Sequence, residues 1–199
     1  MTKTSGIDRL VLLFSKLPGI GKKSAARITY HILDADASYA LTLADELSLI
    51  HKTILCCSEC GGYTENNPCH ICSDTGRDHS TICVTERAAD IRIIEESHEY
   101  NGIFHVLGGL IAPLDGKCPN DLSIEKLLQR VNDGNNIKEI ILALNPTLEG
   151  DTTALYLQKL LKEYPVEVSR LASGMPVGGD IEYIDRLTLS RSLRGRIKI

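Results

Sequence analysis

A chain of 199 residues with 43% hydrophobic and 24% charged residues has the balance of a globular protein, which excludes the disordered and fibrous classes. That length fits one ordinary domain or two or three small ones. Because the chain has no Trp and only two Phe, aromatic stacking is disfavoured as the main way of binding a ligand. The apolar run in residues 1–16 is too short and too interrupted by charge for a signal peptide or a membrane span. We therefore expect a cytoplasmic protein with no membrane partner.

The formal net charge of −4 conceals a strong polarity along the chain. Residues 1–31 carry a net charge of +5, residues 186–199 carry another +5, and the stretch between them carries −14. Basic ends around an acidic body either contact nucleic acid or are merely solvated. Charge alone leaves both interpretations open.

Two short helices, Ile7 to Leu17 and Ser24 to Leu33, are predicted at the start of the chain from the spacing of their apolar residues. The sequence LPGIG between them is a turn, so the two helices form a hairpin. A third helix is predicted from about Tyr39 to His51, where three aliphatic side chains share one face.

The turn of this hairpin has a phosphate-binding geometry. Gly19 and Gly21 have no Cβ to keep a ligand away, and a helix that starts at or just after Gly21 leaves backbone N–H groups without intrahelical partners. Lys22, Lys23 and Arg27 follow and would neutralise further phosphates. The segment resembles the helix-hairpin-helix motif of sequence-independent DNA binders, which assigns residues 1–53 to a DNA-binding domain. The alternative is a plain corner whose glycines serve close packing, whereas a nucleotide-binding P-loop is rejected because its first glycine is missing.

Residues 54–79 are rich in Cys, Gly, Asn, Asp and Pro and hold too few aliphatic residues to build a core of their own. Within them the pattern C-x2-C-x8-C-x2-C provides two pairs of thiolates for one tetrahedral metal, and four sulfur ligands are typical of a structural zinc site. Disulfides or inert buried thiols are the alternatives, and disulfides are disfavoured in a cytoplasmic chain. We predict a small four-cysteine zinc finger that binds structural Zn2+ through Cys57, Cys60, Cys69 and Cys72.

The other three cysteines, Cys56, Cys83 and Cys118, are not assigned to the metal. Cys56 could take the place of Cys57 only if the first C-x2-C pair became C-x3-C. We expect Cys83 and Cys118 to be ordinary packed thiols.

From residue 80 onward, short β-branched runs alternate with helical stretches. Such alternation predicts βαβ units and a mainly parallel sheet covered by helices over residues 80–172. The tail, residues 173–199, is irregular and glycine-rich before it turns basic. The expected fold class is therefore an α/β multi-domain chain.

Acidic residues follow two of the predicted strands. Glu86 ends the strand TICVTE, and Glu149 and Asp151 lie in NPTLEGD after the strand EIILALN, which places them at the carboxyl edge of a parallel sheet, where ligands usually bind. The arrangement resembles the Toprim domain of topoisomerases and primases, in which a Glu and an Asp-x-Asp pair hold magnesium. Here Asn145 and Thr147 occupy the Asp-x-Asp positions, so two of the three carboxylates that would hold Mg2+ are missing. The remaining acids would hold a weak Mg2+, contact a protein partner, or, for Asp151, begin a helix.

The ordered set of these parts, with LGGLIAPLDG, NPTLEGD and RLASGMPVGGDIEY, resembles the RecR family of bacterial recombination mediators over the whole chain. The resemblance implies a non-enzymatic, nucleoid-associated DNA-repair protein that works with RecO and RecF to load the RecA recombinase onto gapped or single-stranded DNA. It also implies a homo-dimer or homo-tetramer that closes into a ring or clamp on DNA. Within the tail, GMPVGGDIEY is similar to the family's C-terminal assembly motif.

Two rival functions are kept open. One is a Mg-dependent Toprim-type nuclease or primase that uses the residual acids, although the sequence singles out no nucleophile for it. The other is an adaptor that binds a partner protein and never touches DNA. Nuclease or synthesis assays separate the first from a mediator, and DNA binding at low salt separates the second.

Overall fold

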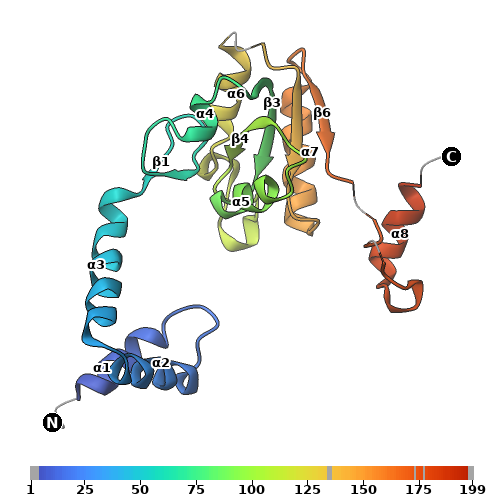
Figure 1. Ribbon diagram of the computed structural model, residues 1–199. Helices are drawn as coiled ribbons and strands as arrows, with labels where there is room; N and C mark the ends of the chain where they lie inside the picture. Colours follow the sequence, from blue (N-terminus) through green and yellow to red (C-terminus); the bar gives the residue numbers. More distant parts are fainter. Residues whose placement is uncertain (1–4, 134–135, 173, 177, 197–199) are drawn as a thin grey trace. The chain divides into compact units, whose positions relative to one another are not determined.

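The structure is a computed structural model that describes residues 5–133, 136–172, 174–176 and 178–196 (Figure 1). It comprises two compact units, Met1–Ile54 and Leu55–Ile199. Across the described residues, no helix is both long and apolar enough to span a bilayer.

The first unit consists of the helices α1 (Gly6–Phe14), α2 (Lys22–Asp34) and α3 (Ala37–Thr53). Side chains cap two of them at the N-terminus: Ser5 and Asp8 form a capping box before α1, and Asp36 accepts from the amide of Ser38 before α3. The three predicted helices are confirmed. Helix α1 ends three residues earlier than predicted because the chain turns there, with the amide of Lys16 bonded to Leu13 O at 3.2 Å.

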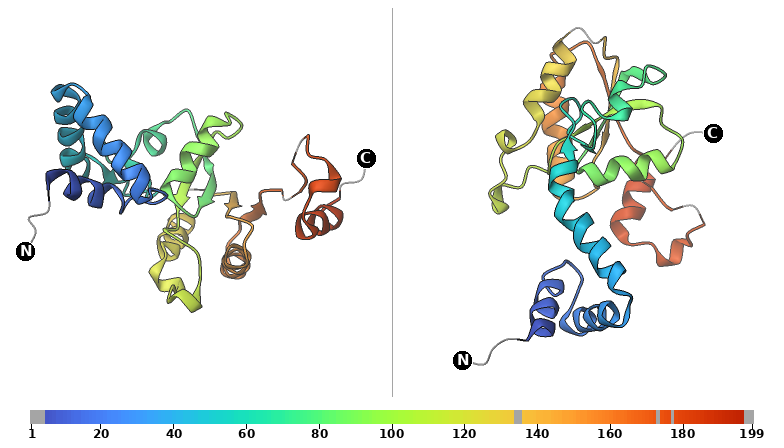
Figure 2. Two further views of the ribbon diagram at one scale, coloured as in Figure 1. Left: turned by 90° about the horizontal axis from the view of Figure 1, so that it is seen from below. Right: turned by 60° about the vertical axis from the view of Figure 1, so that its left-hand side comes forward.

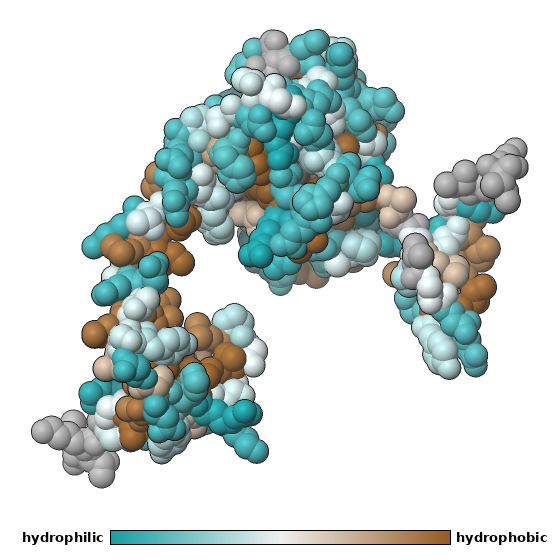
Figure 3. Space-filling model, viewed as in Figure 1, coloured by the Kyte–Doolittle hydropathy of each residue, from teal (hydrophilic) through white to brown (hydrophobic). Residues whose placement is uncertain are grey.

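Burial within the first unit is slight. Ala25 and Thr29 are the two described residues of this unit that are fully buried, because three short helices alone leave most of each helix surface uncovered. Many of its large apolar side chains are exposed, and hydrophobic atoms are scattered over its surface in Figure 3. The most exposed leucines are Leu12, Leu13, Leu33, Leu41 and Leu47.

The second unit is built on a four-stranded sheet in the order β4-β3-β5-β6. All three strand pairs are parallel, which confirms the sequence prediction. In the central register, Cys83 pairs with Phe104 on one side and with Ile141 on the other. The strands are β3 (Asp78–Thr85), β4 (Gly102–Val106), β5 (Glu139–Ala143) and β6 (Glu167–Arg170).

Each face of the sheet has its own core, because successive side chains of a strand point to opposite faces. Ile82 and Val84 of β3 pack with α6 (Ile124–Asn132) and α7 (Leu148–Leu161). The intervening Cys83 packs on the other face, with α5 (Ala88–Glu96) and the cysteine-rich segment. Figure 2, left, shows α5 on one side of the strands and α6 and α7 on the other.

The cysteine-rich segment contains only short elements, and the tail is more helical than expected. The segment has β1 (Leu55–Cys56) paired with β2 (Tyr63–Thr64), followed by α4 (His70–Ser73). The tail, predicted to be irregular, contains the helix α8 (Arg186–Arg194), whose N-cap Asp185 accepts from two backbone amides. Of the GMPVGGDIEY stretch, Val177 lies outside the described residues. The remaining short elements are the 3-10 turns η1 (Pro113–Asp115), η2 (Pro119–Asp121) and η3 (Ile181–Tyr183).

Candidate nucleic-acid interface and metal centre

The turn before α2 leaves the N-terminus of that helix open. Gly19 has φ +77°, a conformation that disfavours any residue with a Cβ. Gly21 is the N-cap of α2 and supplies no side-chain hydrogen bond to it. The first intrahelical bond runs from Ala25 N to Gly21 O at 2.9 Å, so the amides of the three residues between them have no carbonyl of the helix to bond. No described atom beyond the neighbouring residues lies within 4 Å of a Cβ built on either glycine, so a ligand can approach.

Three cationic side chains lie on the helix that begins with these open amides. Lys22, Lys23 and Arg27 are all exposed on the first two turns of α2. Lys23 and Arg27 are four residues apart and therefore lie on the same face of the helix. The first turn of α2 has no acidic residue, so nothing in it cancels the positive end of the helix dipole. The structure thus brings together the donors and cations that the sequence predicted for a phosphate.

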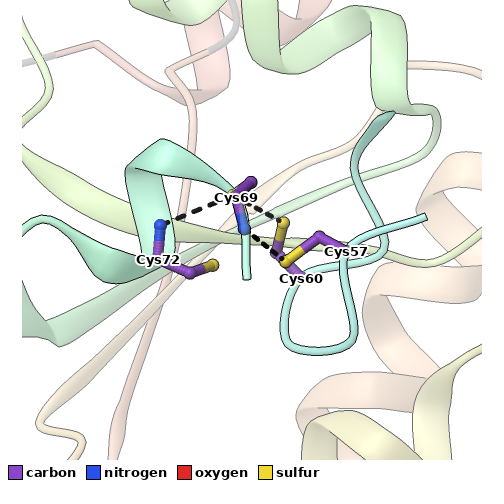
Figure 4. A group of neighbouring side chains, drawn as sticks. All are labelled: Cys57, Cys60, Cys69 and Cys72. Atoms are coloured by element: carbon purple, nitrogen blue, oxygen red, sulfur yellow. Dashed lines mark hydrogen bonds between the residues drawn. The ribbon is translucent and has the colours of Figure 1, made fainter. Parts of the chain in front are cut away.

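The four predicted zinc ligands converge. Cys57 and Cys60 lie around the turn after β1, and Cys69 and Cys72 lie at the start of α4, with their sulfur atoms facing one another (Figure 4). All four Sγ atoms are within 4.8 Å of each other, and the Cys60 and Cys69 sulfurs are 3.7 Å apart. Two sulfurs at the Zn–S distance of about 2.3 Å in a tetrahedron are about 3.8 Å apart, so the cluster fits zinc.

Backbone amides point at the sulfurs of this cluster. The amide of Gly62 donates to Cys60 Sγ at 3.3 Å, and the amide of Cys69 donates to Cys57 Sγ at the same distance. Donors to sulfur favour the thiolate form that a metal needs. A hydrogen bond with Cys72 lowers the pKa of the Cys60 thiol to about 5 and raises the pKa of Cys72, while burial raises the pKa of Cys69. Thiols packed this closely share protons unless one cation holds them all as thiolates.

The cysteine cluster packs on the sheet instead of forming a separate core. Cys57, Cys60 and Cys69 belong to the same buried group as Phe104 and Val106 of β4, and Val106 N donates to Cys60 O at 2.7 Å. The segment that could not build its own core therefore shares one with the sheet.

The remaining cysteines have other surroundings. Cys56 is exposed on β1 and outside the cluster, as predicted. Cys83 is the packed thiol that we expected, and burial raises its pKa to about 12. The expectation that Cys118 is packed is wrong, because it lies exposed in the turn before η2.

At the carboxyl edge of the sheet, an amide takes the place of one Toprim carboxylate. Asn145 Nδ2 donates to Glu86 Oε2 at 2.7 Å. Thr147, at the other substituted position, is the N-cap of α7 and accepts from the amide of Gly150 at 3.1 Å. The loop is folded so tightly that an ideal Cβ at Gly150 would lie 1.9 Å from Asn145 O, so only glycine fits there.

The third residual acid is held by two arginines that the sequence analysis missed. Asp151 Oδ1 lies 2.6 Å from Arg170 at the end of β6, and its Oδ2 lies 2.7 Å from Arg191 of α8. Glu149 is exposed. Helix α7 begins at Leu148, three residues before the predicted start, and Asp151 lies in its first turn, so the interpretation of Asp151 as an acid at a helix N-terminus is confirmed. Among the described residues, Glu86, Glu149 and Asp151 do not converge as ligands of one ion.

Comparison with known proteins matches these parts one by one. Family models match a RecR helix-hairpin-helix at residues 7–50, a RecR four-cysteine zinc finger domain at 54–74, a Toprim domain at 80–172 and a RecR C-terminal region at 174–197. The recombination protein RecR of Treponema denticola is 56% identical over 98% of this chain and 99% of its own length. The RecR proteins of Treponema pallidum and Moorella thermoacetica are 52% and 48% identical, each over 96% of this chain and 94% or 95% of their own length. The expected multi-domain α/β fold with a four-cysteine zinc finger is thereby confirmed.

Proposed function

The chain belongs to the RecR family of recombination proteins, and from that premise we propose that it is a non-catalytic DNA-binding mediator of recombinational repair. The single observation that carries the DNA-binding part is the open N-terminus of α2. There, uncapped amides behind Gly21 stand beside Lys22, Lys23 and Arg27. Amides and cations in this combination bind phosphates without reading bases.

We propose that copies of the chain assemble, because one hairpin offers few phosphate contacts. The first unit buries only two of its described residues fully and exposes leucines on all three helices. Exposed apolar surfaces are typical of association sites, and in this proposal a second copy of the same chain covers them in a closed symmetric arrangement. A dimer or tetramer presents several hairpins to one DNA molecule, and joined weak contacts gain affinity through avidity.

Family membership supports a proposal for the partners. We propose that the assembly acts with RecO and RecF to load RecA onto gapped or single-stranded DNA, and that it forms a ring or clamp. The polarised charge supports this arrangement, since the basic residues 1–31 would face the DNA while the acidic body remains for protein partners.

The absence of catalysis is also part of the proposal. Two Toprim carboxylates are replaced, by Asn145 and Thr147, and both side chains have structural hydrogen bonds of their own. Phosphoryl transfer at such an edge depends on metal ions held by several carboxylates. We therefore expect no cleavage or synthesis when labelled duplex or gapped DNA is incubated with Mg2+ or Mn2+.

Fluorescence anisotropy of labelled duplex DNA over a salt series tests the DNA interface. The double variant Lys22→Ala, Arg27→Ala removes two exposed cations beside the open amides. We expect at least a tenfold loss of affinity near 100 mM salt, and a salt dependence shallower by about 0.9 in log–log slope for each phosphate that the variant no longer neutralises.

Lys52→Ala is the matched control, because Lys52 is an exposed lysine of the same unit in the last turn of α3. We expect it to bind DNA as the wild type does. Circular dichroism of both proteins checks that the fold is intact. An unchanged affinity and salt slope in the double variant would refute the proposed interface.

A further inference from the structure

The Toprim family implies magnesium at the carboxyl edge of the sheet, and the residues present there do not fit it. Asp151 is the acid of this edge with the most extensive ionic contacts, and both of its oxygens face guanidinium groups, at 2.6 and 2.7 Å. Mg2+ needs near-octahedral oxygen ligands at about 2.0–2.1 Å. A dication beside two arginines would also be repelled by them.

The arginines come from two separate parts of the chain. Arg170 ends β6, whereas Arg191 lies in the last turn of α8, forty residues beyond Asp151. Arg191 makes a second contact with the same edge, because its Nη1 donates to Pro146 O at 3.1 Å. The Arg191 guanidinium therefore contacts both the Asp151 carboxylate and the backbone of the loop before α7. Both arginines also line one cavity of about 350 Å³ with Asn145, Ala172 and Thr188.

Burial makes this contact more than a surface ion pair. The Asp151 side chain is 34% exposed, but its Oδ1 atom is almost fully buried and accepts no aligned hydrogen bond among the described residues. Within the part of the chain that the structure describes, its charge is balanced by the ion pair with Arg170. Removing a partner from a carboxylate in such a position leaves an uncompensated charge, which costs more than the loss of an exposed pair.

We infer that this edge is a docking site for the chain's own C-terminal helix α8, in which the Arg191 guanidinium, together with Arg170, supplies Asp151 with the positive charge that a metal supplies in a metal-binding Toprim domain. The segment that occupies the docking site is therefore α8, which carries Arg191 in its last turn. Docking of α8 and binding of a metal at Asp151 exclude each other. Helix α8 has no other cation in contact with this carboxylate among the described residues.

Hydrogen–deuterium exchange of the full chain tests the inference, with peptides that cover residues 186–196. Asp151→Asn keeps the shape of the side chain and removes its charge, and Arg191→Gln removes the opposite charge. We expect each variant to accelerate exchange of the α8 amides at least threefold, because the ion pair no longer holds the helix on the sheet.

Arg194→Gln is the matched control, since Arg194 lies in the same last turn of α8 as Arg191 and interacts equally with the helix dipole. We expect less than a twofold change from it, and less than a twofold change in the wild type when 10 mM MgCl2 is added. Acceleration in only one of the two test variants, or in neither, would overturn the docking site. Acceleration of α8 exchange by Mg2+ in the wild type would show that a metal competes for Asp151 and would overturn the exclusion.

Discussion

The cysteine cluster and the carboxyl edge of the sheet lie in the same compact unit, and both carry side chains of a metal-ligating type. In the cluster, four Sγ atoms face one another, and the donors close to them are weak backbone amides. At the edge, Glu86 is bonded to the Asn145 amide and Asp151 to two arginines. The two places differ in how the negative charge is balanced.

Ligand identity predicts a metal site only when no other group balances the charge of the ligands. Thiolates gathered this closely repel one another and need a cation that binds them all. Carboxylates that already have guanidinium or amide partners have no such need, and a metal would have to displace those partners first. The cluster is therefore built for zinc, and the edge is held together by the chain itself.

The largest expected effect comes from breaking the zinc site. We predict one zinc per chain and its loss in Cys60→Ser or Cys69→Ser. Structural zinc contributes about 10–16 kcal/mol of apparent binding free energy in zinc-finger peptides, so the segment around α4 should unfold and expose the sheet face that it covers. Zinc released into a colorimetric chelator, together with thermal unfolding, measures both consequences.

Cys56→Ser and Cys118→Ser are the controls, because both cysteines are exposed and lie outside the cluster. We expect them to retain zinc and thermal stability. The assignment of zinc to the cluster would be contradicted if the wild-type protein folded correctly without zinc. It would also be contradicted if Cys60→Ser kept one zinc per chain.

A smaller loss is expected from Gly150→Ala at the carboxyl edge. The added Cβ would collide with Asn145 O, so the loop that places Asn145 against Glu86 must open. We expect destabilisation by about 3 kcal/mol, at the upper end of the usual cost of overpacking, measured by urea unfolding. Gly6→Ala is the comparison, because a Cβ there approaches no atom closer than 3.8 Å. Equal stability of the two variants would mean that backbone crowding does not fix this edge.

The sequence could predict what depends on local spacing. The C-x2-C pairs, the alternation of strands and helices and the glycine turn before α2 each set local geometry within a few residues, so their patterns sufficed. The loss of two Toprim carboxylates could also be predicted, because Asn145 and Thr147 occupy their positions in the sequence.

Local spacing could not predict the partners of those acids. Arg170 and Arg191 approach Asp151 from 19 and 40 residues away, and no periodicity links positions so far apart. The net charge of residues 186–199 predicts a basic end but does not show which carboxylate each arginine contacts.

The helix in the tail does have a local signal, because Asp185 is an N-cap residue before Leu187 and Leu189. The exposure of Cys118 also has one, because the residue begins a turn at Pro119.

The smallest effect, and the one that compares the two places most directly, is expected from Asn145→Asp. The substitution restores one Toprim carboxylate and sets it against Glu86, where Asn145 now donates at 2.7 Å. Two carboxylates that close cannot both ionise freely, so the pKa of the pair rises above the value in the unfolded chain. The folded state then binds protons more tightly than the unfolded state, and its stability is greatest at low pH and falls as the pH rises through the raised pKa.

We expect the variant to be about 1 kcal/mol less stable than the wild type at pH 8 and closer to it at pH 5. Asn145→Ala loses the hydrogen bond without gaining charge, so its deficit should be equal at both pH values; a deficit in Asn145→Asp that also ignores pH would mean that charge balance does not govern this edge.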